Sequence, residues 1–200
     1  RNRTAGRDLV SFAGYGAYEH ELPTAVPALM MRSEFVTSYT PYQPELSQGV
    51  LQALFEYQTM IASLYGLEIA NASLYDGASA AVEGLNLAAA ATKRTAVWVS
   101  DGIHPNVREV VTPLTGPRLD VHSAPLVDGV TAWPNNLGEP AALLVGYPNA
   151  LGVLEDIPAA ARRAHDAGAL LVTYADPVAA GILRSVGSQG ADVAVGEGQP

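Results

Sequence analysis

Short apolar runs alternate with helical segments from residue 67 onward, and this alternation limits the fold more than any other feature. Helices are predicted over Gly77–Thr92, Pro105–Thr112 and Ile157–Ala167. The apolar runs between them read as strands, namely LEIAN (67–71), TAVWVS, RLDVHSA, PAALLVGY, ALLVTYADP and ADVAV. Strands of nearly continuous apolar character are typical of a mostly parallel sheet that helices flank on both faces. The predicted fold class is therefore α/β, in which ligands bind beyond the carboxyl ends of the strands.

The composition excludes several kinds of partner and chemistry. The 200-residue chain is 48% hydrophobic and carries a net charge of -9, which argues against nucleic acid or an anionic membrane as its main partner. Its apolar runs are too short to cross a bilayer. The chain has no cysteine, which excludes disulfides and thiolate chemistry and fits a reducing compartment. Its four histidines lack the spacing of a metal site, so we expect no metal.

The stretch NASLYDGASAAVEG, residues 71–84, predicts a turn followed by a helix that begins near Gly77. Asp76-Gly77 favours a turn, and the Ala-rich run after it propagates a helix. A helix start built from Gly, Ala and Ser leaves backbone N–H groups accessible to a phosphate or carboxylate. Asp76, Gly77 and Ser79 are therefore candidate cofactor-binding residues. The alternative is that Asp76 or Ser79 only caps the helix.

Two further candidates follow strands, where a parallel sheet places its ligand. Asp176 ends the run ALLVTYADP, and a carboxylate there can pair with a protonated ring nitrogen, as in a pyridoxal phosphate (PLP) site. The alternative is that Asp176 caps the turn that follows. His104 follows the run TAVWVS, and it either stacks on a ring or bonds a nearby backbone carbonyl.

The loop SYTPYQPELSQG, residues 38–49, has the most unusual composition in the chain. Its tyrosines, prolines and glutamines give a stiff amphipathic surface with many hydrogen-bonding groups. Tyr39, Tyr42 and Gln48 are therefore candidates for lining a pocket or a subunit interface. The alternative is that the tyrosines only fix a proline-stiffened loop to the core.

A long helix is predicted to begin at Pro44 and to end at Gly66 as its C′ residue. Its apolar residues fall on one face, which predicts that this face packs into the core. These residues are Leu51, Leu54, Phe55, Ile61 and Leu64. A shorter helix is predicted upstream, over Pro23–Met31. We divide the chain into an N-terminal segment, 1–46, with a loop and a short helix, and a partial large domain, 47–200.

Several motifs resemble those of a known family. The run SYTPYQPELSQGVLQALFEYQTMIASLYGLEIANASLYDGASA, with GYGAYEHELP before it and GADVAVGEGQP after it, closely resembles the glycine decarboxylase P-protein of the glycine cleavage system. More narrowly, the chain resembles subunit 1, the N-terminal-half type of two-subunit bacterial enzymes. It covers nearly all of the chain and is weaker over residues 113–140. Because the sequence has no initiating Met and stops soon after a strand, we expect a piece of a longer protein.

The resemblance implies a truncated large domain of a fold-type-I PLP enzyme in the bacterial cytoplasm. It implies that glycine is decarboxylated and that its aminomethyl group passes to the lipoyl arm of the H-protein. A PLP enzyme also needs a lysine just past a late strand to hold the cofactor. The chain has one lysine, Lys93, at the end of a predicted helix. Gln199-Pro200 stand where the catalytic subunit of the family carries His-Lys.

We therefore expect PLP to be held by the partner, P-protein subunit 2, and the cofactor-site candidates of this chain to be vestigial. In this hypothesis the loop from Tyr39 to Gln48 faces the partner's cofactor. The alternative is a non-catalytic binding or regulatory scaffold of the same fold. A nicotinamide-binding oxidoreductase is disfavoured, because no Gly-rich fingerprint lies between a strand and a helix.

Overall fold

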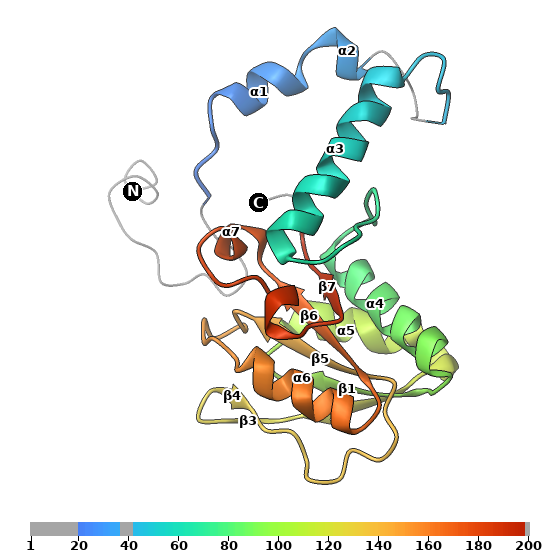
Figure 1. Ribbon diagram of the computed structural model, residues 1–200, viewed down its shortest axis with the longest axis vertical. Coiled ribbons are helices and arrows are strands. Elements are labelled where there is room, and N and C mark those ends of the chain that lie inside the picture. Colours follow the sequence, from blue (N-terminus) through green and yellow to red (C-terminus); the bar gives the residue numbers. More distant parts are fainter. Residues whose placement is uncertain (1–19, 37–41, 199–200) are drawn as a thin grey trace, which may run out of the picture.

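A five-stranded parallel sheet forms the centre of the computed structural model, which describes residues 20–36 and 42–198 (Figure 1). The strands lie in the order β2-β1-β5-β6-β7, and every neighbouring pair runs parallel. Their bounds are Ala96–Ser100 for β1, Asp120–Ala124 for β2, Ala142–Tyr147 for β5, Leu170–Ala175 for β6 and Val193–Val195 for β7. The predicted α/β class and five of the six predicted strands are therefore confirmed.

Helices cover both faces of the sheet because its central strand is apolar on both. All residues of β5 are buried, and successive side chains of a strand point to opposite faces. Leu143 packs in a cluster with α6 (Ile157–Asp166). Leu144 packs in a second cluster with α4 (Gly77–Thr92) and α5 (Pro105–Thr115). One hydrophobic core therefore lies on each side of the sheet.

Helix α3 (Gln48–Tyr65) extends away from the sheet, and its C-terminal end contacts the rest of the domain (Figure 1). The predicted end is confirmed, since Gly66 adopts a φ of 68°, a left-handed conformation that glycine tolerates. The predicted start at Pro44 is wrong, because the helix begins four residues later with Ser47 as its N-cap residue. The Ser47 hydroxyl donates to the carbonyl oxygen of Gln43 at 2.7 Å, so the preceding residues form a turn of their own.

The apolar face of α3 does not pack into the core along its whole length, as the sequence had predicted. Phe55 is 67% exposed and Leu51 is 36% exposed, whereas Tyr65 at the C-terminal end is buried. Leu54, Ile61 and Leu64 are half-buried. Helical periodicity identifies an apolar face but not the surface that covers it. In this chain the sheet covers only the last turns of the helix.

Residues 67–71 form a loop between α3 and α4 instead of the predicted strand. Ile69 is 84% exposed, and Gln58 of α3 donates to the carbonyl oxygen of Ala70 at 2.6 Å. A strand needs a neighbouring strand to satisfy its backbone groups. Within the described part of the chain, this segment pairs with none, which explains why an apolar run stays irregular here.

A short antiparallel hairpin, β3 (Leu126–Val127) with β4 (Val130–Thr131), was not predicted from the sequence. Its turn residues, Asp128 and Gly129, have φ values of 52° and 81°. An Asp-Gly pair between apolar residues is a known signal for such a turn.

Helix α5 also runs three residues past its predicted end, to Thr115.

Shorter elements complete the fold. Helix α1 lies inside the predicted 23–31 segment and has no buried residue. Among the described residues, no helix is both long and apolar enough to span a bilayer. The remaining bounds are Ala25–Met30 for α1, Ser33–Val36 for α2, Gly116–Arg118 for η1, Pro177–Ala180 for α7 and Gly187–Gln189 for η2.

Candidate functional site

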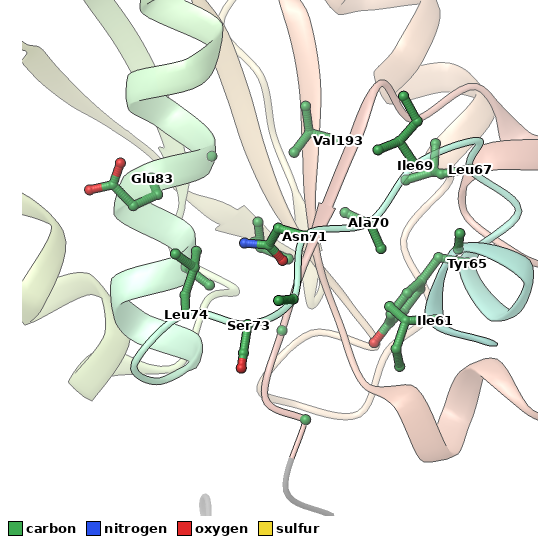
Figure 2. Close-up of a pocket in the computed structure, with 18 of the residues that line it drawn as sticks. Ile61, Tyr65, Leu67, Ile69, Ala70, Asn71, Ser73, Leu74, Glu83 and Val193 are labelled. Carbon is green, nitrogen blue, oxygen red and sulfur yellow. The ribbon is translucent and has the colours of Figure 1, made fainter. Parts of the chain in front are cut away.

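A cleft of about 1600 Å³ lies at the β7 edge of the sheet, bordered by α3, α4 and the residues that follow β7. The loop between α3 and α4 runs through it, and Figure 2 shows Glu83 of α4 on one side of this loop and Ile61 and Tyr65 of α3 on the other. Pro177, after β6, and Glu197, after β7, also line the cleft. It therefore includes the carboxyl ends of two parallel strands, where an α/β ligand site is expected.

Asp76 caps helix α4 at the border of this cleft. Its Oδ1 accepts a hydrogen bond from the backbone N–H of Ser79 at 2.6 Å. Hydrogen bonds from Ser79 lower the pKa of the Asp76 carboxyl below its usual range, because they favour the charged form. The structure thus shows the capping role that had been the alternative for Asp76, and one amide of the helix start is already engaged.

Gly77, the first residue of α4, is held by a carboxylate from a distant part of the chain. Its backbone N–H donates to Oε2 of Glu197 at 3.0 Å. A Cβ at this position would lie 2.5 Å from the hydroxyl oxygen of Tyr174 and 3.2 Å from the backbone nitrogen of Glu197. A larger residue here would therefore force the Tyr174 side chain and the 196–198 segment to shift. Sequence reasoning missed Glu197, because nothing local indicates a contact across 120 positions.

Asp176 caps the short helix α7. Its Oδ1 accepts from the backbone N–H groups of Val178 at 2.7 Å and Ala179 at 3.1 Å. Nearby, the hydroxyl of Tyr65 donates to the carbonyl oxygen of Ala175 at 3.0 Å. Burial, and after it the negative charge of Asp176, raises the pKa of Tyr65 above its usual range. Asp176 thus lies near Tyr65, while its Oδ1 accepts from backbone N–H groups.

The other predicted site residues are not brought into the cleft. His104 is the N-cap residue of α5, where its Nδ1 accepts from the backbone N–H of Asn106 at 3.3 Å. Tyr42 is 87% exposed, and Gln48 lies at the end of α3 that points away from the sheet (Figure 1). Tyr39 lies outside the described residues.

Lys93, the single lysine of the sequence, lies at the opposite end of α4 from Gly77. It is the exposed C-cap residue of this helix, with a φ of 61°. At 1.5 Å per residue, a helix of 16 residues separates the two ends by roughly 24 Å. The described part of the cleft therefore contains no amine.

A buried hydrogen-bonded network, also missed from the sequence, fixes the neighbouring strand ends. Glu155 is buried, with 6% of the residue exposed. Its Oε1 accepts from Thr131 Oγ1 at 2.7 Å and from Asn149 Nδ2 at 2.9 Å. The hydroxyls of Thr131 and Ser100 are 2.6 Å apart. This network ties the β3–β4 hairpin to the ends of β1 and β5. Among the described residues, no group of three His, Cys, Asp or Glu side chains is arranged to hold a metal ion.

The residues of the cleft do not fit PLP within this chain alone. PLP needs an amine for its aldehyde carbon and donors for its phosphate. Lys93 is at the wrong end of α4, and the first amide of that helix is bonded to Glu197. The Ser79 amide is likewise bonded to Asp76.

The sequence matches the family described as the glycine cleavage system P-protein over residues 2–200. The chain belongs to this family. It is 50% identical over 195 residues to the probable glycine dehydrogenase (decarboxylating) subunit 1 of Desulforamulus reducens, covering 95% of this chain and 44% of that protein. It is 48% identical over 205 residues to the protein of the same name from Prosthecochloris aestuarii, covering 100% of this chain and 46% of that protein. The chain thus spans less than half the length of these relatives.

Solved structures agree with the family assignment. A crystal structure of glycine decarboxylase (P-protein) of the glycine cleavage system, in inhibitor-bound form, matches with a TM-score of 0.86 and 53% identity. The match covers 91% of this chain and 42% of the other. A cystathione gamma lyase from Micromonospora echinospora matches with a TM-score of 0.51 and 23% identity, over 68% of this chain and 35% of the other, which shows a shared fold alone. The expected fold class is thereby confirmed.

Proposed function

We propose that this chain forms part of subunit 1 of a glycine dehydrogenase (decarboxylating) that works in the glycine cleavage system of the bacterial cytoplasm. Glycine is the substrate of the assembled enzyme, which decarboxylates it and transfers the aminomethyl group to lipoylated H-protein. The high identity to subunit 1 relatives supports this function. The names of these relatives give no support to the alternative, a non-catalytic binding or regulatory scaffold.

We further propose that subunit 2, and not this chain, holds PLP. The observation that carries this proposal is the place of Lys93, at the end of α4 remote from Gly77. From that end of the helix its amine lies too far from the start of α4 to form an imine with a cofactor bound there. The cofactor of the assembly supplies the electron sink for decarboxylation when bound. The residues of this chain would contribute walls and contacts to a site centred on the partner.

The test combines reconstitution with chemical labelling. Exchange of labelled CO2 into glycine is measured with the full-length subunits separately and together, in the presence of lipoylated H-protein. We expect exchange only when both subunits are present; full exchange by subunit 2 alone would contradict the proposed function. The assembled protein is then treated with PLP and reduced with borohydride, and peptide mapping locates the labelled residue. We expect the label on a lysine of subunit 2. Lys93→Arg serves as the control and should leave exchange unchanged, whereas stoichiometric labelling of Lys93 would overturn the assignment of the cofactor.

We propose that the loop before α3, together with Gln48 at the first position of that helix, lies at the subunit interface, because this segment is polar, stiffened by proline and exposed at Tyr42 and Gln48. Tyr42→Phe and Gln48→Ala should weaken assembly or slow exchange. Gln52→Ala is the matched control, since Gln52 lies one turn further along α3 and bonds Glu56 of the same helix at 2.7 Å. Unchanged assembly and exchange in both loop variants would show that the loop has only a local structural role.

A further inference from the structure

The segment Gly196-Glu197-Gly198, which follows β7, lies close to other parts of the chain at both of its glycines. A Cβ on Gly196 would lie 2.3 Å from the carbonyl oxygen of Ala175, and a Cβ on Gly198 would lie 2.8 Å from the hydroxyl oxygen of Tyr57. The backbone contact excludes a side chain at Gly196, whereas a side chain at Gly198 would require the Tyr57 ring to shift. The segment is therefore placed so that Glu197 alone presents a side chain, and this side chain reaches the start of α4.

The start of α4 is the part of the cleft best suited to an anion, and carboxylates of the chain itself take up its donors. Helix N-termini attract negative charge through their unpaired N–H groups and the helix dipole. Here Asp76 Oδ1 accepts from the Ser79 amide, and Glu197 Oε2 accepts from the Gly77 amide. A phosphate at this place would have to displace one carboxylate and would meet the charge of the other.

We propose that Glu197 is a built-in anion that closes the N-terminus of α4 to phosphate-bearing ligands. This goes beyond the proposed function, because it concerns what the cleft of this chain excludes and does not depend on the reaction of the assembled enzyme. The described part of the cleft offers no lysine as a covalent anchor, while Glu197 takes the place of the non-covalent phosphate site. The two features are independent, so restoring a lysine alone would not create a cofactor site in this chain.

The experiment measures phosphate binding to the full-length protein assembled with its partner. Radiolabelled inorganic phosphate is the probe, and equilibrium dialysis gives the number bound per copy of this chain. Glu197→Ala removes the occupying carboxylate. The matched control is Glu83→Ala, which removes an exposed carboxylate from the same helix and the same cleft without touching Gly77.

We expect Glu197→Ala to bind about one more phosphate per chain than the unaltered protein, because an open helix N-terminus binds such an anion. Glu83→Ala should bind no more than the unaltered protein. Glu197→Ser is expected to behave as Glu197→Ala, so that either folded variant decides the question. The proposal is overturned if the unaltered protein already binds this phosphate, if a variant with native circular dichroism gains none, or if Glu83→Ala gains as much. All of these readouts are independent of glycine exchange.

Discussion

Replacing Glu155 by alanine should destabilise the fold by about 2–4 kcal/mol, because one buried donor loses its acceptor and two others lose one of two partners. The Thr131 backbone N–H lies 3.0 Å and 3.2 Å from the two carboxylate oxygens. Glu155→Ala removes this acceptor, and a buried donor left without a partner costs about 1–3 kcal/mol. The Thr131 hydroxyl retains Ser100 Oγ at 2.6 Å. The Asn149 side chain retains the Gly129 carbonyl oxygen at 2.8 Å. These two donors therefore add less than the first.

Urea unfolding of the full-length protein, followed by far-ultraviolet circular dichroism, measures the change. Glu155→Gln keeps an oxygen that can accept from the same donors, so we expect a smaller loss of about 1–2 kcal/mol. Glu139→Ala is the matched control, because Glu139 is exposed, and its effect should stay within about 0.5 kcal/mol. A loss below about 1 kcal/mol for Glu155→Ala would refute the reasoning, since the donors would then have other partners.

Three further predictions concern α3 and α4. Phe55→Ala should cost less than about 1 kcal/mol in the 200-residue chain, measured by urea unfolding, because the side chain is 67% exposed; a loss of several kcal/mol would mean that this face is covered. Tyr65→Phe should cost about 1–2 kcal/mol in the same assay, since it removes the bond to the Ala175 carbonyl, and no loss would show that this bond is unimportant. The lowered pKa of Asp76 means that its capping contribution is present above its unfolded value of 3.8 and is lost as pH falls through the folded value. The free energy of unfolding, measured from about pH 6 down to about pH 2, should therefore fall less steeply in Asp76→Asn than in the unaltered chain. Identical slopes in the two proteins would contradict this.

Local patterns predicted the elements whose environment is encoded in their own sequence. Strand β5 is apolar at every position because both of its faces are covered, and α3 ends at Gly66 because a left-handed residue favours glycine. The same reasoning failed where the outcome depends on a neighbour. Residues 67–71 have strand composition but no strand to pair with, and Phe55 lies on an apolar face that the sheet does not reach.

The candidate site shows the same division. Asp76 and Asp176 could be placed at helix starts from their sequence context, and both cap helices in the structure. Their choice between capping and ligand binding could not be made from sequence, because either role uses the same oxygen atoms. Glu155 and Glu197 were missed because each bonds a backbone amide far away in the sequence. Only the folded chain brings these carboxylates to their donors.

The contact between Glu197 and Gly77 also stabilises the start of α4. Gly77 is buried beside Tyr174 and Glu197, and a buried backbone N–H without a partner would be costly. An internal carboxylate satisfies the amide and the helix dipole together. The glycine at position 77 is then favoured by this packing whether or not a phosphate ever binds. A ligand-type turn in a sequence is therefore evidence for the local backbone geometry, while the occupant of that geometry has to be established separately.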